Sequence, residues 1–315
     1  MSLRASIDLG TNTCLLLVAD WDAKNHVVQK VVADYSTIVR LGQGVDKARR
    51  LDPAAIERTL YCLKEYVEEL GDYGVKPAEV TCVATSQARD AQNGAEFFAR
   101  VKKETGFQFQ VISGEDEAKY SYRGALLPGV TDPVVIDIGG GSTELIAGDW
   151  GGGAGQSLDM GSVRFTERFF KTDPVTDGEF WKCRDEIDRM IETMRPWRQS
   201  LPTPKGTGAA AKRELLAVAG TATTLASWFL GLRDFDAAKI DQCRLTRGDL
   251  HRMVEELKWR TVEERRSLTG IEPLRADVLL AGAMILWRTM ELLDFPSTRV
   301  STRGLRFGVL QMDSS

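Results

Sequence analysis

The sequence predicts an α/β protein with an internal duplication, organised as two domains. Short apolar runs that end in glycine-rich turns alternate with helical patterns along the chain, as in sheets flanked by helices. One strand–turn–strand unit near the N-terminus recurs after residue 133. A length of 315 residues exceeds one ordinary core and fits two domains of typical size.

The first half of the chain has the patterns of four strands and two helices. The strands are expected at residues 5–9, 15–19, 80–84 and 107–112, and the helices at residues 53–70 and 91–105. Pro53 at the start and Gly71 at the end are typical boundaries of the first helix. Ser113, with Asp116 three residues later, indicates the N-cap of a further helix.

The second half repeats this alternation. Strands are expected at residues 134–138, 145–147 and 215–219, long helices at residues 177–195 and 275–293, and a loop at residues 202–208. Pro196 is expected to stop the first of these helices. Turn residues gather between residues 125 and 133, which places the domain boundary there. We expect one domain at residues 1–125 and a second at residues 126–302, with residues 303–315 packed back on the first.

Two turns at equivalent positions of the duplicated unit carry the candidate chemistry. The first contains Asp8, Gly10, Thr11 and Thr13, and the second contains Asp137, Gly139, Gly140 and Ser142, 129 residues later. Glycine permits a positive φ and the close approach of a ligand, and successive amides in such a turn can bind phosphate oxygens. An acid beside an anion site indicates a divalent cation, for which Mg²⁺ is the natural candidate. Two ordinary β-hairpins would carry the same residues, so that interpretation stays open.

The composition narrows the classes of function. A net charge of −4 provides no general basic field for nucleic acid, and no apolar run is long enough to span a membrane. The five cysteines are widely spaced, without the paired spacing of zinc sites, and are expected to be reduced thiols. We therefore expect a cytoplasmic protein that binds neither nucleic acid nor membranes.

Several segments form an ordered set of motifs. They lie at residues 6–13, 84–93, 112–118 and 135–144, and further matches follow at residues 160–163, 219–223 and 301–306. This set resembles the exopolyphosphatase and guanosine pentaphosphate phosphohydrolase (Ppx/GppA) family over essentially the whole chain. The resemblance implies two ribonuclease-H-like, actin-like domains with mixed sheets flanked by helices, and an active site in the interdomain cleft. Because family members often pair, it also admits a homodimer.

The resemblance assigns roles to single residues. From spacing alone, Glu115, Asp116 and Glu117 are equal candidates for the group that activates water. The family pattern selects Glu117, and it aligns a phosphate-contacting arginine with Arg89 and a water-positioning acid with Glu144.

The expected metal ligands and phosphate contacts follow from the same motifs. The metal ligands are Asp137, Glu144 and Asp8. The phosphate contacts are Gly10, Thr11, Asn12, Thr13, Gly139, Gly140, Gly141, Ser142, Thr143, Gly220 and Thr221. Gly220 and Thr221 also fit a plain strand-to-helix turn with a threonine cap. Gln87 stands where the family usually has a small residue.

These observations predict a hydrolase that removes a terminal phosphate by metal-assisted attack of water. The substrate is inorganic polyphosphate, which we favour, or the 5′-phosphate of guanosine pentaphosphate. A small-molecule kinase of the same superfamily and a phosphate-binding regulator without turnover are the alternatives. Lys24, Lys30 and Arg40 are candidate contacts for a polyanion.

Overall fold

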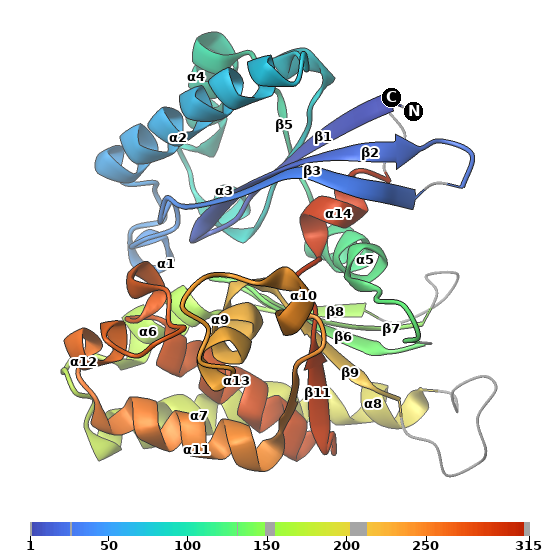
Figure 1. The fold of residues 1–315 in the computed structure, drawn as a ribbon. Helices are drawn as coiled ribbons and strands as arrows, with labels where there is room; N and C mark the ends of the chain where they lie inside the picture. The colour runs from blue at the N-terminus through green and yellow to red at the C-terminus, as the bar shows by residue number, and fades with distance from the viewer. Residues whose placement is uncertain (1, 26, 131, 149–154, 202–212, 312–315) are drawn as a thin grey trace. The chain divides into compact units, whose positions relative to one another are not determined.

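The chain forms two compact units in a computed structural model that describes residues 2–25, 27–130, 132–148, 155–201 and 213–311. Unit 1 comprises Met1–Gly124 and Gly304–Ser315, and unit 2 comprises Ala125–Arg303. Figure 1 shows each unit as a sheet with helices packed on it. In the described part of the chain, no helix combines the length and the apolar character needed to cross a bilayer.

Unit 1 is built on a five-stranded mixed sheet in the order β3-β2-β1-β4-β5. The strands are β1 (Ser2–Leu9), β2 (Thr13–Asp22), β3 (Val27–Ile38), β4 (Thr81–Ala84) and β5 (Phe109–Val111). The first three strands form an antiparallel meander, whereas β4 and β5 run parallel to β1. Parallel pairs need crossover connections, and helices supply them here.

Helices cover both faces of the sheet of unit 1. Leu16 points to the face packed by α2 (Pro53–Asp72) and α4 (Gly94–Thr105). Its neighbour Leu17 points to the opposite face and packs on Phe307 of α14 (Leu305–Val309). Successive side chains of a strand alternate between faces, so an apolar β2 can serve two cores at once.

Local signals explain where α2 begins. The carboxylate of Asp52 accepts hydrogen bonds from the backbone N–H groups of Ala54 and Ala55, and Pro53 takes the first helical position. Both features stabilise a helix start. The helix expected from Pro53 is therefore confirmed, although it continues one residue past Gly71 to Asp72.

Unit 2 contains a six-stranded sheet in the order β10-β11-β9-β6-β7-β8. The strands are β6 (Val134–Ile138), β7 (Thr143–Ala147), β8 (Gly155–Leu158), β9 (Leu215–Val218), β10 (Arg244–Thr246) and β11 (Ser297–Val300). The central strands β6, β9 and β11 run parallel, and β6, β7 and β8 are antiparallel. Every residue of β6 is buried, as expected for a central strand.

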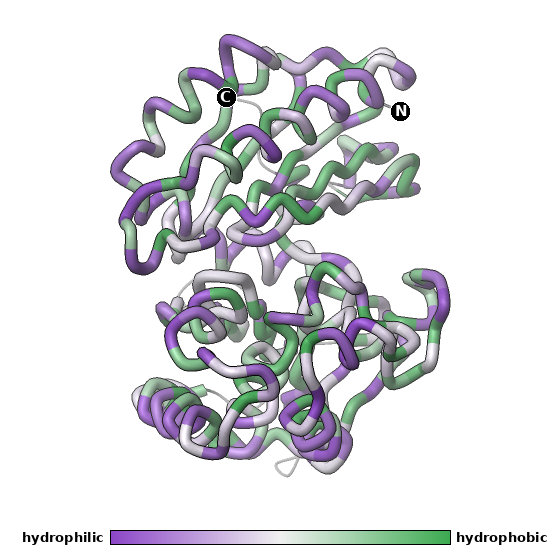
Figure 2. The backbone as a smooth tube through the Cα atoms, turned by 90° about the vertical axis from the view of Figure 1, so that its left-hand side faces the viewer, coloured by the Kyte–Doolittle hydropathy of each residue, from purple (hydrophilic) through white to green (hydrophobic). Residues whose placement is uncertain are grey.

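Helices complete the core of unit 2. The main ones are α6 (Ser162–Phe169), α7 (Asp177–Glu192), α9 (Ala219–Phe229), α11 (Arg247–Trp259) and α13 (Leu279–Leu292). Figure 1 shows α7, α13 and α11 side by side, and buried residues from all three join one cluster with β6 and β9. Figure 2 shows hydrophobic and hydrophilic residues alternating along the helices, as expected for helices that bury one face.

The remaining elements are mostly short, apart from the twelve-residue helix α5. They are the helices α1 (Val45–Ala48), α3 (Ser86–Asp90), α5 (Gly114–Ala125), α8 (Arg195–Ser200), α10 (Ala237–Ile240) and α12 (Val262–Arg266), and two 3-10 turns, Pro77–Glu79 and Pro273–Arg275. Ser113 caps α5, because its Oγ accepts the N–H of Asp116 at 3.0 Å. The N-cap expected at Ser113 is confirmed.

The predicted fold class, α/β with mixed sheets flanked by helices, is confirmed, but several boundaries differ. The helix expected over residues 177–195 ends at Glu192, and Pro196 lies in the first turn of α8, where a proline is tolerated. The helix expected from Arg275 begins at Leu279, after a 3-10 turn. The helix expected from Ala91 begins at Gly94. The loop expected at residues 202–208 lies outside the described residues.

Candidate active site

The two predicted turns have the same local geometry. The N–H of Gly10 donates to the carbonyl of Thr13 at 2.9 Å, and the N–H of Gly139 donates to the carbonyl of Ser142 at 3.0 Å. A Cβ on Gly10 would lie 3.3 Å from the Thr13 oxygen, and one on Gly139 would lie 3.2 Å from the Ser142 oxygen. The duplication seen in the sequence is therefore also a duplication of backbone structure.

The glycines of these turns leave room for neighbouring backbone atoms, and they do not adopt a left-handed conformation. Positive φ values occur at other glycines of the described chain, but not at Gly10, Gly139, Gly140 or Gly141. The positive φ that glycine permits is therefore not adopted at these positions. Gly161 shows what the lack of a side chain permits, since a Cβ there would lie 2.4 Å from the carbonyl of Gly140.

The first turn is fastened to α3 by a buried hydrogen-bond network. The hydroxyl of Thr11 donates to Oε1 of Gln87 at 3.0 Å and lies 3.0 Å from the hydroxyl of Ser86. Nε2 of Gln87 donates to the carbonyl of Leu9 at 2.8 Å. Gln87 therefore ties the end of β1 to the turn, and the hydroxyl of Thr11 is already engaged within the protein.

The first turn nevertheless keeps donors for an anion. Nδ2 of Asn12 is buried and has no hydrogen-bond partner among the described residues. Within the same ranges, the backbone N–H groups of Thr11 and Asn12 reach no protein acceptor. A buried amide without a partner is costly, and a phosphate oxygen would satisfy it.

The second turn is held by the start of α6. The N–H of Ser162 donates to the carbonyl of Gly139, and the N–H groups of Val163 and Arg164 donate to the carbonyl of Gly140. Nε of Arg164 donates to the carbonyl of Gly141 at 2.7 Å. The start of α6 thus satisfies the carbonyls of Gly139, Gly140 and Gly141, and the amides of the turn other than that of Gly139 are able to meet an anion.

Two carboxylates of unit 2 lie at directly opposed positions of β6 and β7. Asp137 pairs with Glu144 in the antiparallel register, so both side chains point to the same face of the sheet. Glu144 is fully buried, Asp137 is 8% exposed, and Oε1 of Glu144 accepts a hydrogen bond from Ser157 at 2.7 Å. In unit 1 the equivalent partner of Asp8 is Leu15, so the carboxylate pair belongs to the second turn.

Arg89 and Glu117 form an ion pair in unit 1. Nη1 of Arg89, on α3, lies 3.0 Å from Oε2 of Glu117, in the first turn of α5. The Glu117 side chain is only 10% exposed, whereas Glu115 is exposed and Asp116 bonds to Ser113. Geometry therefore separates Glu117 from the two neighbouring acids, which the spacing left equivalent.

The third predicted turn differs from the first two. Ala219, with φ at 68°, opens α9, and Val218 is the N-cap without a side-chain cap bond. The threonine cap considered for Thr221 is therefore wrong. A Cβ on Gly220 would lie 1.7 Å from Nη1 of Arg275, so a guanidinium lies directly against this turn. Burial lowers the pKa of Arg275 to about 10, which still leaves it charged at neutral pH.

Some predicted residues have roles within the fold. The hydroxyl of Thr143 donates to the carbonyl of Met160, so it is already engaged. Asp8 is half-buried at the end of β1, and Ser142 is buried. Sequence reasoning missed Arg275, because nothing in its own segment indicates that it contacts a turn more than fifty residues earlier in the chain.

Comparison with known proteins agrees with the motifs. The model of the Ppx/GppA phosphatase family matches residues 17–314. Exopolyphosphatase 2 of Mycobacterium tuberculosis is 37% identical over 295 residues, which cover 90% of this chain and 88% of that protein. A bifunctional 3-dehydroquinate synthase/phosphatase of Fusobacterium nucleatum is 33% identical over 303 residues, which cover 93% of this chain but 43% of that protein.

Solved structures show the same relationship. A crystal structure of an exopolyphosphatase-like protein aligns with a TM-score of 0.85 at 30% identity, covering 98% of both chains. An Aquifex aeolicus member of the Ppx/GppA family aligns with a TM-score of 0.76 at 31% identity, covering 98% of this chain and 96% of that chain. The chain described here therefore belongs to the Ppx/GppA phosphatase family.

Proposed function

We propose that this chain hydrolyses the terminal phosphoanhydride of inorganic polyphosphate, and that the 5′-phosphate of guanosine pentaphosphate is its second substrate. Family membership supports a phosphatase, and the Mycobacterium relative is named an exopolyphosphatase. The observation that carries the proposal is the ion pair of Arg89 with the buried Glu117. Such a pair supplies a water-activating carboxylate and a phosphate-binding cation together.

Glu117 and Arg89 have different roles in the reaction. The carboxylate of Glu117 accepts a proton from water as the water oxygen attacks the terminal phosphorus. The bond from that phosphorus to the bridging oxygen breaks, and the shortened chain leaves with the electron pair. Arg89 holds Glu117 through Nη1, and its remaining N–H groups offset charge on the transferring phosphoryl group.

The glycine-rich turns bind the phosphates. Asn12 offers a buried side-chain amide, and the backbone amides of both turns add donors without adding charge. We propose the same role for Gly220 and Thr221, where Arg275 contributes a cation beside the turn. Donors fixed by the fold need little reorganisation when the substrate arrives.

Asp137 and Glu144 fit a divalent cation. Within the described ranges, no three acidic, histidine or cysteine side chains gather to hold a metal alone. Mg²⁺ does not require such a cage, because one or two carboxylates together with substrate phosphates are its usual ligands. Two opposed, buried carboxylates supply that set, and Asp8 is the proposed third contributor. When bound, Mg²⁺ would neutralise negative charge on the phosphates.

The alternatives receive no support from the comparisons. A sugar or acetate kinase would need a pocket for an acceptor alcohol, and the family matched is one of phosphatases. A regulator without turnover would not require a water-activating carboxylate. We further propose a cytoplasmic homodimer that binds neither nucleic acid nor membranes, a quaternary state that analytical ultracentrifugation can test.

Phosphate release separates these functions. The wild-type protein is expected to release phosphate from polyphosphate in the presence of Mg²⁺, and Glu117→Gln is expected to lower kcat by about a hundredfold to ten-thousandfold. Glu115→Gln is the matched control, because it removes a charge from the same helical turn at an exposed site. Turnover that persists in Glu117→Gln would contradict the assigned role, and an inactive wild type would favour the regulator.

A further inference from the structure

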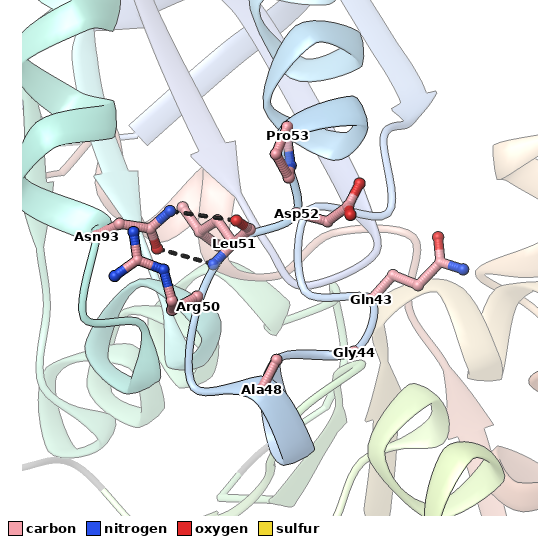
Figure 3. Close-up of a pocket in the computed structure, with 8 residues that line it drawn as sticks. All are labelled: Gln43, Gly44, Ala48, Arg50, Leu51, Asp52, Pro53 and Asn93. Atoms are coloured by element: carbon pink, nitrogen blue, oxygen red, sulfur yellow. Dashed lines mark hydrogen bonds between the residues drawn. The ribbon is translucent and has the colours of Figure 1, made fainter.

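Unit 1 contains a pocket of about 350 Å³ that none of the predicted site residues lines. Its walls come from the segment between the sheet and α2, and from Asn93 before α4. Figure 3 shows Arg50 beside Asn93 on one side of the pocket, and Gln43 and Asp52 on the other. The pocket therefore belongs wholly to one unit of the chain.

One wall of the pocket is bonded to the first glycine-rich turn. The N–H of Gly42 donates to the carbonyl of Thr11 at 2.8 Å, and the N–H of Arg40 donates to the carbonyl of Asn12 at 2.9 Å. A Cβ on Gly42 would lie 2.3 Å from Cγ2 of Thr11, so the two segments are in close contact. Gln43, which lines the pocket, is one residue away from this contact.

The other wall is bonded to the segment that follows Arg89. The side-chain amide of Asn93 accepts the N–H of Leu51 at 2.8 Å and donates to its carbonyl at 3.1 Å, as Figure 3 shows. The N–H of Gln92 donates to the carbonyl of Arg49 at 2.9 Å. The pocket is thus built between the phosphate-binding turn and the helix that carries Arg89.

The backbone around the pocket is held in an unusual conformation. Arg40 and Arg49 have φ values of 52° and 54°, in the left-handed region that ordinary residues rarely adopt, and Gly44 has a φ of 74°. Such conformations persist only where the surroundings impose them, and they cluster at functional sites. The bonds to Thr11, Asn12 and Gln92 impose them here.

The segment that forms the pocket is basic, and Arg50 and Asp52 are the charged residues that line the pocket itself. Residues 40–52 contain four cations and two acids, listed as Arg40, Lys47, Arg49, Arg50, Asp46 and Asp52. Oδ1 of Asp52 is committed to the first amides of α2. The side chains of Arg50 and Gln43 donate to no group in the described part of the chain, so both can donate to a ligand.

Other basic residues of the unit are too far away for the same role. Lys24 and Lys30 lie at the end of β2 and β3 remote from the turn. The ten residues of β2 span roughly 30 Å at the usual rise of a strand. Of the three cations singled out in the sequence, only Arg40 is next to the turn.

We propose that this pocket binds the phosphate groups that lie upstream of the cleaved one, with Arg50 and Gln43 as donors. The inference rests on the proposed function, and it names an extended phosphate chain as the preferred substrate. The chain would run from the first turn, past Gly42, into the pocket.

The test compares substrates of different length. Arg50→Gln is expected to raise KM for long-chain polyphosphate by about tenfold to a hundredfold, the loss of one charged hydrogen bond, with kcat within twofold. KM for inorganic triphosphate should change less than twofold, because the turn alone holds it. Arg50→Lys should restore part of the loss, and Lys30→Gln is the control for removing one positive charge elsewhere.

Several results would overturn this proposal. They are an unchanged KM for long chains, an equal loss in Lys30→Gln, an equal loss with triphosphate, and an effect confined to guanosine pentaphosphate. The last result would assign the pocket to a nucleoside.

A binding measurement tests the pocket independently of the proposed catalytic function. Isothermal titration of polyphosphate into Glu117→Gln and into Glu117→Gln with Arg50→Gln should show weaker binding in the second protein. If the wild type releases no phosphate, the proposed function fails, but this difference in Kd would still support an anion-binding pocket. Equal Kd values would reject the pocket whatever the turnover.

Discussion

Arg89 holds Glu117 with the same nitrogen that it uses to hold the backbone. Nη1 lies 3.0 Å from Oε2 of Glu117 and donates to the carbonyl of Ile112 at 2.7 Å. Ile112 directly follows β5, and Glu117 lies in the first turn of α5. One guanidinium group therefore fixes the carboxylate relative to the sheet, and its other N–H groups are left for a second partner.

Replacing Arg89 by lysine tests whether the other N–H groups of the guanidinium bind phosphate. A lysine has one nitrogen, and Glu117 and Ile112 would occupy it, so no planar pair of donors would remain for phosphate. Arg89→Lys is expected to lower kcat/KM for polyphosphate by about tenfold to a hundredfold. Arg123→Lys, at an exposed site near the end of α5, is the control. Full activity in Arg89→Lys would show that the arginine only supports the fold.

The opposed carboxylates of β6 and β7 predict a metal-dependent stability. Asp137 and Glu144 face each other across the strands, so they repel unless a cation lies between them. Glu144→Gln should raise the melting temperature in EDTA by about 2 °C, and Mg²⁺ should stabilise the wild type but not the variant. In assays, both Glu144→Gln and Asp137→Asn should require at least tenfold more Mg²⁺.

Differential scanning fluorimetry with and without EDTA measures the first effect. Asp8→Asn is the informative comparison, because Asp8 lies opposite Leu15 and faces no second carboxylate across the strands. Its melting temperature in EDTA is expected to change little. A lower melting temperature for Glu144→Gln in EDTA would show that Glu144 is stabilised by protein contacts and does not form a metal site.

The close contact of α14 with α5 predicts that one added methyl group strongly destabilises the fold. A Cβ on Gly308 would lie 1.9 Å from the carbonyl of Tyr120, a backbone atom that cannot move away alone. Gly308→Ala should therefore lower the free energy of unfolding by about 2 kcal/mol or more. Urea denaturation should show this as a lower midpoint.

Gly71→Ala is the matched control for that substitution. Gly71 lies within α2, where a Cβ would meet nothing within 4 Å. The same added methyl should stabilise the protein by about 0.5 to 1 kcal/mol, because alanine favours the helix and restricts the unfolded chain. Equal midpoints for the two variants would mean that α14 moves aside at little cost. Because α5 also carries Glu117, activity should fall only in Gly308→Ala.

The sequence predicted the elements that have strong local signals. The strand–turn–strand units and α2 were expected because their apolar patterns, their glycines and Pro53 act within a few residues. The strand β3 was not expected, because its exposed and half-buried residues follow no simple alternation. It forms through pairing with β2, which a single segment does not reveal. The five-residue helix α3 is likewise too short for a periodic pattern.

The candidate site shows the same limit. Motif order singled out Arg89 and Glu117, but only the fold shows that they touch. Gln87 looked like a minor departure, yet it is the residue that ties the first turn to the end of β1. Arg275 lies against Gly220 through packing between α9 and the 3-10 turn Pro273–Arg275, a contact that no local pattern encodes. These three contacts are tertiary, so the spacing of residues along the sequence does not reveal them.

The cysteines provide a prediction about reactivity. All five are buried and free: Cys14, Cys62, Cys82, Cys183 and Cys243. Burial raises the pKa of Cys14, Cys82 and Cys183 well above the ordinary value, and it raises that of Cys243 to about 11. Only the thiolate attacks alkylating or disulfide reagents. The native protein should therefore react slowly at pH 8, and all five thiols should react at once in denaturant.

Cys62 is the exception that sharpens this prediction. Hydrogen bonds, the largest from Cys14, lower its pKa, but its side chain is 1% exposed and a reagent cannot reach it. Timed labelling with an aromatic disulfide reagent that releases a coloured thiolate should therefore detect no fast-reacting thiol in the wild type. The variant Lys30→Cys should add one. A fast thiol in the wild type that is lost in Cys62→Ala would show that unit 1 opens locally around Cys62.

The raised pKa values also predict how stability depends on pH. When a folded-state pKa lies above the unfolded value, the unfolded chain loses its proton first as pH rises. The stabilisation is complete below the unfolded pKa of about 8.5 and is lost as pH rises toward the folded values. The free energy of unfolding should therefore fall between about pH 8.5 and 11, and Cys183→Ala should show a shallower slope over that range. An identical slope in Cys183→Ala would assign the alkaline loss of stability to other groups, such as Tyr66, whose pKa is raised by burial.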